Sequence, residues 1–463
     1  MKKELVSLHT LLSWDDVTEK RLRQIEDTPY EEVAGLVRHW RNARMSWQDV
    51  YLLLALASAR WVDHRGPFIG HGTFNGGAVL RASSILSPRY KILAVLQMAG
   101  YVFALLRHPN YGPYVMLESF ELAEDASETV SSFISDLESG EKALLSEHRA
   151  ARLVQRSTQD SRWLMLWAAL RQYPENEHRL LIVQRAFDLL DDTHGWRYAE
   201  AFYRAAIQYL GNRPQTILAN QVLTQWPGDD CPEFTGTIDI KRCEELCSNL
   251  VAADFGQEAN ILMASIRRHA NAETVREAIA LASSALLYSS AFDAHAVTGV
   301  HSVLDLVDDS RCPSNIRHLA WVIGLSSSRT RRQKQDRARW TSREAKLGPR
   351  AQIGLDHVID CVMHDPSGQE GAARAQQFLL SGGDPEQLAG VLMEISLTTS
   401  EPFDAIHNVK MLWGLLNQTR KSLWPERSWI HLSAGARVVA MSVNPSGLRE
   451  DIDEQWRQVL FDV

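Results

Sequence analysis

Four histidines and one lysine are the residues of this sequence whose types and spacing could bind a metal. His71 and His194 each precede a glycine, and each His-Gly pair opens a stretch rich in small residues. Glycine allows the backbone and the imidazole to approach a buried site closely, and we expect the small residues that follow, Gly77 among them, to leave room for a ligand beside the helix. His295 begins the apolar stretch HAVTGVHSVLDLV, and His407 lies three residues before Lys410 in FDAIHNVKMLWGLL. Any one such histidine is more commonly a core or capping residue, but their joint occurrence favours a shared site.

Lys410 is unusual because only ten of the 49 basic residues are lysines and because apolar residues surround it. On a helix, His407 and Lys410 project from the same face. A lysine in such surroundings must be paired, lose its charge or be chemically modified. An uncharged amine can add carbon dioxide and become a carbamate, which is an anionic oxygen ligand. Several imidazoles with one anionic oxygen suit a redox metal such as iron.

At these positions the sequence resembles the questin-oxidase-like family, which takes part in the ring-opening of anthraquinones and related polyketides. The resemblance rests on His71-Gly72, His194-Gly195, His295-Ala296-Val297-Thr298 and His407-x-x-Lys410, in the family's order from about residue 60 to 440. It implies an α-helical fold and one non-haem iron(II) held by His71, His194, His295, His407 and a carboxylated Lys410. It also implies an oxygenase that uses dioxygen on a hydrophobic, aromatic or quinone-like molecule, by oxidative ring cleavage or Baeyer–Villiger-type oxidation.

The sequence departs from the family pattern in three places. Thr73 and Phe74 follow the first His-Gly pair, where bacterial members often have a proline, and residues 1–60 and 326–350 match no part of the family that we can place. The identity of the substrate therefore stays open. Some family members were described as dependent on reduced nicotinamide, but Gly70-His71-Gly72 lacks the spacing and the strand context of a dinucleotide fingerprint. NADPH remains an option without a binding motif.

The elements that must position these residues are helices, and the periodicity predicts an all-α fold. Apolar residues recur at spacings of three and four in residues 47–59, 91–106, 162–172, 179–190, 197–210, 259–269, 273–287 and 408–416. The only strand-like piece is 236–240. Because the ligands are spread from residue 71 to 410, we expect one large multi-helix domain over 1–463, with a helical extension at 1–60 and the site between helices. Expected caps or turn residues are Ser46, Asp191 and Ser310.

Two segments break the helical pattern. Residues 225–240 are rich in proline, glycine and aspartate, which predicts a long ordered loop or a lid that controls substrate access. Residues 326–350 carry nine Lys or Arg residues. This second segment is either a solvated, partly disordered insertion or a docking patch for an acidic partner, phosphate or nucleic acid.

Composition and charge limit the function classes. The 463 residues are 45% hydrophobic and 23% charged, as is typical of globular proteins, and the net charge of −8 argues against a nucleic-acid binder. The five cysteines are odd in number and unpaired in pattern, so we expect structural thiols in a reducing cytoplasm. The most apolar run, 92–106, is shorter than the roughly 20 residues that span a bilayer, so it predicts a core helix and no membrane partner. No targeting segment is visible.

Other metal chemistry has little support in the sequence. A di-iron site requires two Glu-x-x-His motifs, and we find one, from Glu175 to His178, in a turn. The pair His364-Asp365 is also found in phosphohydrolase sites, but the proline that follows it indicates a helix end. A zincin motif, a P-loop and a serine nucleophile elbow are absent from the sequence.

Several other residues have two interpretations each. Asp191 and Asp404 lie three residues before candidate ligands, so each could orient an imidazole, cap a helix or face solvent. Phe74, Trp196 and Trp413 could line a substrate cavity or pack in the core. The alternative function is a non-catalytic α-helical interaction protein, in which the histidines are core residues and residues 326–350 dock a partner.

Overall fold

The computed structural model describes residues 11–65, 70–108, 116–119, 126–140, 142–174, 176–225, 232–253, 257–268, 270–290, 294–324 and 353–444. Within these ranges the chain is mostly helical and has no strand, and an isolated bridge joins Leu11 to Leu117. The predicted all-α fold is confirmed. The strand-like piece 236–240 forms no strand: residues 236–239 belong to a loop, and a helix begins at Ile240. The basic segment 326–350 lies outside the described residues.

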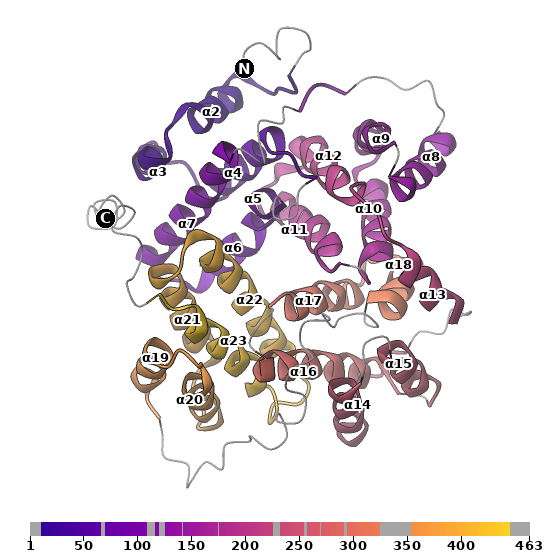
Figure 1. Cartoon of the computed structure of the whole chain (residues 1–463), viewed down its shortest axis with the longest axis vertical. Coiled ribbons are helices and arrows are strands. Elements are labelled where there is room, and N and C mark those ends of the chain that lie inside the picture. Colours follow the sequence, from indigo (N-terminus) through magenta and orange to yellow (C-terminus); the bar gives the residue numbers. More distant parts are fainter. Residues whose placement is uncertain are drawn as a thin grey trace. The chain divides into compact units, whose positions relative to one another are not determined.

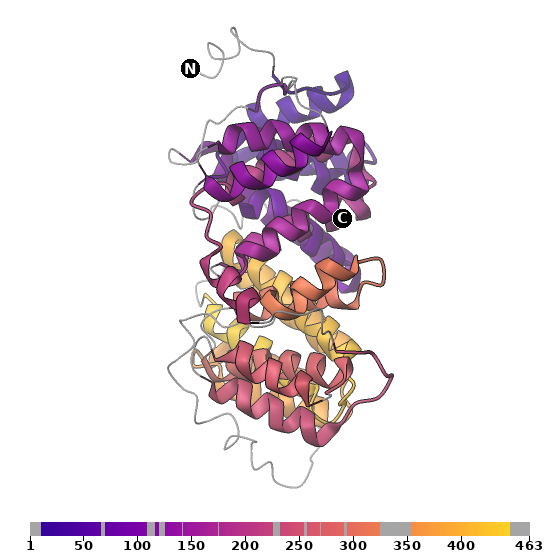
Figure 2. The same ribbon diagram turned by 90° about the vertical axis from the view of Figure 1, so that its right-hand side faces the viewer.

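The helices form two compact units, which can be followed along the chain in Figures 1 and 2. Unit 1 comprises Met1–Gln172, Leu181–Thr216 and Arg449–Val463, and unit 2 comprises Tyr173–Leu180 and Ile217–Leu448. The expectation of one domain over 1–463 stays a prediction.

The first half of the chain supplies the helices of unit 1. They are α2 (Asp16–Asp27), η1 (Tyr30–Glu32), α3 (Val33–Asn42), α4 (Trp47–Trp61), α5 (Gly70–Phe74), α6 (Gly76–Ala82), η2 (Ser83–Ile85), α7 (Pro88–Arg107), α8 (Ala126–Ser139), α9 (Ala143–Arg156), α10 (Thr158–Gln172), α11 (His178–Asp192), η3 (Gly195–Tyr198) and α12 (Ala199–Leu210). The first three residues of α11 belong to unit 2.

Helix α4 is central to unit 1 because it packs against α2, α5, α6, α7 and α12. Its start follows from the sequence, since the hydroxyl oxygen of Ser46 accepts a hydrogen bond from the amide of Asp49 at 3.1 Å. All residues from Val50 to Trp61 are buried, as expected of a helix that is apolar on every side.

Helix α7 contains the apolar run that we expected to form a core helix. Proline at its first position starts the helix without losing a hydrogen bond. Among the described residues, α7 is the one helix long and apolar enough to cross a membrane, and 78% of its most apolar stretch is buried inside the protein. Such burial is usual for a core helix.

The second half of the chain supplies the helices of unit 2. They are α13 (Ile217–Gln225), α14 (Ile240–Ala252), α15 (Glu258–Arg267), α16 (Ala272–Ser290), α17 (His295–Asp308), α18 (Ser314–Leu319), η4 (Ala320–Gly324), α19 (Leu355–His364), α20 (Gln369–Leu380), α21 (Pro385–Thr399), α22 (Pro402–Lys421) and α23 (Trp429–Ser442). In its core α23 packs against α16, α20, α21 and α22, and α22 also packs against α17 and α21.

Candidate metal site

The first His-Gly pair lies on the short helix α5 of unit 1. His71 is buried, and its ring meets the ring of Tyr101 edge-on at 6.4 Å between centroids. Gly72 lies against α4 so closely that a Cβ atom would stand 2.7 Å from Ser58 Oγ and 2.8 Å from Leu105 Cδ1. The glycine therefore lets α5 contact α4 and α7 directly.

The second His-Gly pair follows α11. His194 has a left-handed backbone, with φ of 53°, and its side chain is exposed. Left-handed torsions are uncommon for residues with a side chain. A Cβ atom on Gly195 would stand 2.8 Å from Leu52 Cδ1 of α4. Both glycines thus pack on α4, which gives the two pairs a common packing role, whereas one histidine is buried and the other is exposed.

The small residues after the first pair do not leave room for a ligand where we expected it. A Cβ atom on Gly77 would stand 2.8 Å from the amide nitrogen of Leu189 and 3.0 Å from the carbonyl oxygen of Arg185. The backbone of α11 fills this space. Small residues here allow two helices to approach closely, so the expectation of open space beside Gly77 was wrong.

In unit 2, His407 and Lys410 lie on one buried face of α22. Their exposed fractions are 9% and 6%. The Nδ1 atom of His407 lies 2.6 Å from the carbonyl oxygen of Phe403, one turn earlier, and the two rings are 4.1 Å apart. Since a carbonyl oxygen only accepts, Nδ1 carries the proton and Nε2 keeps its lone pair in the neutral ring. This is the arrangement that metal-binding histidines commonly have.

Helix α17 runs parallel to α22, and two contacts define their register. A Cβ atom on Gly414 would stand 3.1 Å from Nδ1 of His301, and seven residues later the Lys421 amine lies 3.2 Å from the carboxylate of Asp305. At about 1.5 Å per residue, His407 lies roughly 10 Å before Gly414, and His295 lies roughly 9 Å before His301. The register therefore brings the first turn of α17 to the level of His407.

His295 is the first residue of α17, and its side chain lies outside the described residues. Thr298, one turn later, is buried. His301 is also buried and lies 3.6 Å from Asp305. Its position six residues after His295 places it on another part of the helix surface, as we expected.

The five predicted ligands divide between the units. Unit 1 contains His71 and His194, and unit 2 contains His295, His407 and Lys410. Within the described part of the chain, no three or more His, Cys, Asp or Glu side chains form a group that could hold a metal ion. Of the five, His407 has a buried ring whose Nδ1 carries the proton, and Lys410 is buried on the same face of α22.

Neither Asp191 nor Asp404 contacts the histidine ring that it was suggested to orient. Asp191 lies within α11, where it pairs with Arg162 at 3.0 Å and accepts from the indole nitrogen of Trp196 at 2.9 Å. Asp404 is exposed, and Nδ1 of His407 contacts a backbone carbonyl instead. Local backbone geometry, which puts the carbonyl of residue i−4 beside the ring, explains the difference.

The three aromatic residues considered as cavity walls have packing partners. Phe74 is 2% exposed and lies 5.8 Å from the His64 ring, and Trp196 stacks on Phe187 at 5.9 Å. Trp413 is half-buried beneath the guanidinium of Arg420 at 5.4 Å. Phe74 therefore shows the core packing that we named as the other interpretation, whereas Trp196 and Trp413 are only partly buried.

The described cysteines fit a structural role. Cys243 and Cys247 are buried on α14, and burial raises the pKa of Cys247 to about 12. Thiols in this state are poor nucleophiles and poor metal ligands. Cys231 lies outside the described residues.

Part of the expected lid, 232–239, is an ordered loop held against the start of α16. Glu273 accepts hydrogen bonds from the amides of Thr235 and Gly236, and the amide of Asp239 donates to Thr274 Oγ1 at 2.9 Å. Although burial raises the pKa of Glu273, the two amide donors outweigh burial and lower it overall. Residues 226–231 lie outside the described residues.

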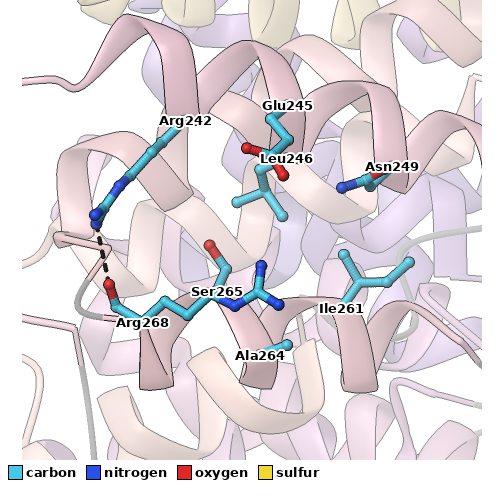
Figure 3. Close-up of a pocket in the computed structure, with 8 residues that line it drawn as sticks. All are labelled: Arg242, Glu245, Leu246, Asn249, Ile261, Ala264, Ser265 and Arg268. Carbon is cyan, nitrogen blue, oxygen red and sulfur yellow. Dashed lines mark hydrogen bonds between the residues drawn. The ribbon is translucent and has the colours of Figure 1, made fainter.

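A pocket of about 270 Å³ lies between α14 and α15 and contains none of the predicted ligands (Figure 3). Its lining includes Glu245, Asn249 and Ser265, and the Arg242 guanidinium donates to the Arg268 carbonyl at 3.0 Å.

The chain was compared with family models, with curated proteins and with solved structures, and it has no match in any of the three.

Proposed function

We propose that this chain is a non-haem iron oxygenase of the questin-oxidase-like kind, acting in the cytoplasm on a hydrophobic aromatic or quinone-like small molecule. His71, His194, His295, His407 and Lys410 would hold the metal. When bound, iron would supply the dioxygen chemistry that protein side chains lack. The residues of the chain would bind and orient the substrate and keep water from it.

The arrangement of His407 and Lys410 is the observation that supports this proposal best. Both side chains are buried on the face of α22 that also carries Gly414 and Lys421, the residues that contact α17. The proton on Nδ1 of His407 leaves Nε2 as the donor atom for a metal. Burial of a charged side chain is costly unless it is compensated, so a role for Lys410 beyond packing is part of the proposal.

The parallel register of α17 and α22 is the second support. It brings the backbone of His295 to the level of His407, although these residues are separated by more than 100 positions in the sequence. Three of the five proposed ligands thus come from two helices in contact. His71 adds a buried imidazole in unit 1, whereas the exposed side chain of His194 gives the proposal no support.

Metal analysis tests the proposal directly. Protein purified without oxygen should contain about one iron per chain, and His295→Ala and His407→Ala should each lose most of it. His364→Ala is the matched control, because His364 is an exposed histidine at the end of α19. Full iron content in both ligand variants, or no iron in the natural chain, would favour the non-catalytic interaction protein instead.

A further inference from the structure

The pocket between α14 and α15 is a second candidate site, and it lies within unit 2 (Figure 3). The two helices run antiparallel, because Arg242 near the start of α14 donates to the carbonyl oxygen of Arg268, directly after α15. The lining residues recur at spacings of three and four along each helix, so they share one face of it. They include Glu245, Leu246 and Asn249 from α14, and Ala264, Ser265 and Arg268 from α15 and its C-cap.

Glu245 and Arg268 bring opposite charges into this pocket without pairing with each other. Both side chains extend into the space between the two helices in Figure 3. In the described part of the chain, neither side chain forms an ion pair or a hydrogen bond. The neighbouring Glu244, in contrast, pairs with Arg427 at 3.6 Å. The pocket therefore presents one carboxylate and one guanidinium that a ligand could bind.

The second guanidinium group of the pocket, that of Arg242, is already engaged. It donates to the Arg268 carbonyl at 3.0 Å and lies 3.3 Å from the carboxylate of Asp239, the N-cap of α14. Asp239 balances its charge, and the charges of Glu245 and Arg268 sum to zero. A simple anion would be repelled by Glu245 and a simple cation by Arg268, so this arrangement favours a ligand that carries both charges.

The rest of the lining suits a small ligand with an apolar part. Leu246 is buried and Ile261 is half-buried, and both present aliphatic side chains to the pocket. Asn249 and Ser265 add an amide and a hydroxyl group. At about 270 Å³ the pocket is somewhat smaller than the roughly 300 Å³ at which pockets for drug-sized molecules begin. A molecule of the size of an amino acid fits this space.

We propose that this pocket binds a small zwitterion, a free α-amino acid with an apolar side chain. The Arg268 guanidinium pairs with the ligand carboxylate, and the Glu245 carboxylate pairs with the ligand ammonium. Leu246 and Ile261 contact the ligand side chain. The site contains none of the proposed metal ligands, so it goes beyond the oxygenase proposal and does not depend on it.

Three probes with one carbon skeleton test the inference by isothermal titration calorimetry on the full chain. L-leucine carries both charges, 4-methylpentanoate lacks the ammonium group, and 3-methylbutylamine lacks the carboxylate. Each analogue loses one charged hydrogen-bonding group. We therefore expect the natural chain to bind leucine about tenfold more tightly than either analogue.

Two substitutions should affect the probes differently. Arg268→Gln should weaken the binding of leucine about tenfold and should not weaken that of 3-methylbutylamine, which has no carboxylate. Glu245→Gln should weaken leucine by a similar factor and should not weaken 4-methylpentanoate, which has no ammonium group. Ala264→Leu keeps both charges but fills part of the pocket, so it should weaken all three probes.

Arg267→Gln and Glu244→Gln are the matched controls. They make the same replacements at neighbouring exposed positions that do not line the pocket, and both variants should bind leucine as the natural chain does. Glu245 and Arg268 are exposed as well, so the fold should tolerate all four changes. No binding of leucine by the natural chain, equal affinity for the three probes, or equal losses in the variants and the controls would overturn the inference.

Discussion

The guanidinium group of Arg60 donates from Nη1 to both carboxylate oxygens of Glu19, at 2.8 and 2.9 Å. Its second nitrogen, Nη2, donates to Glu26 at 2.8 Å. Arg60 is fully buried at the end of α4, and both glutamates are on α2. The pairs therefore join the first described helix of unit 1 to its central helix.

Removal of this arginine should loosen α2. Arg60→Ala leaves two partly buried carboxylates without their partner, and we expect the free energy of unfolding to fall by about 2–4 kcal/mol. Arg65→Ala is the control, because the Arg65 guanidinium is 59% exposed and pairs with the neighbouring Asp63, so its loss should cost less than about 0.5 kcal/mol. Urea unfolding measures the free energy of unfolding of both variants. Equal losses would contradict the role of Arg60 in holding α2 against α4.

The contact between α6 and α11 predicts a strong effect of one methyl group. Gly77→Ala pushes Cβ against the backbone of Leu189, which cannot move aside as a side chain can, so we expect a loss of about 1–3 kcal/mol. Gly35 has no atom near its Cβ position, and Gly35→Ala in the exposed part of α3 should instead stabilise by up to about 1 kcal/mol. If both substitutions shift the urea midpoint in the same direction, the packing argument fails.

His431 predicts a pH dependence of stability. Burial, with a smaller contribution from Arg276, lowers its pKa to about 3, and Nδ1 lies 2.7 Å from Ser284 Oγ. The folded protein therefore holds this ring neutral while the unfolded chain, with an ordinary pKa near 6.5, takes up a proton. The stability contributed by the neutral ring is complete above pH 6.5 and falls by about 1.4 kcal/mol per pH unit below it.

His431→Asn keeps a donor near Ser284 and removes the titration. Between pH 6.5 and 4, the free energy of unfolding should fall less in the variant than in the natural chain. The difference should be about 1.4 kcal/mol per pH unit. His364→Asn makes the same replacement at an exposed position and serves as the surface control. The free energy of unfolding can be measured by urea titration at several pH values in this range. If it falls equally with pH in the natural chain and in His431→Asn, burial of His431 does not control the pH dependence of stability.

Lys410 is predicted to carry a carbamate in the metal-loaded protein. The neutral amine nitrogen forms a bond to the carbon of carbon dioxide and loses a proton, which gives one negative charge and one free proton. Reconstitution with iron and bicarbonate should therefore load more metal than reconstitution without bicarbonate. Labelled bicarbonate should give a carbamate carbon signal in NMR spectra.

Lys410→Arg cannot form this adduct and should lose both the signal and the bicarbonate response. Lys421→Arg is the control on the same helix, since Lys421 is 42% exposed and pairs with Asp305 and Asp308. Iron loading that ignores bicarbonate in the natural chain would identify Lys410 as an ordinary amine.

Local patterns predicted the helices well. The apolar spacing around residues 91–106 and 273–287 corresponds to α7 and α16, and Ser46 caps α4 as expected. Asp191, expected as a cap or turn residue, lies instead within α11 and pairs with Arg162 and Trp196 on other elements. A cap is encoded by neighbours in sequence, whereas an ion pair depends on distant residues that the pattern does not reveal.

The sequence predicted only those features of the candidate site that depend on residues close together in the chain. His407 and Lys410 share a face because of their spacing, and the burial of that face follows from the apolar residues around them. The contact between Tyr173 and Gly299 could not be predicted, because the two residues are more than 100 positions apart and no local pattern announces such a pairing.

The parallel register of α17 and α22 has an electrostatic consequence. Both helices point the same way, so the positive ends of their dipoles, at His295 and Pro402, lie on the same side of the contact between His301 and Gly414. An ammonium group near that end is disfavoured and an anion is favoured. The side chain of Lys410 points back toward its own helix start, so a carbamate on it would lie nearer to these positive ends, where an anion is favoured.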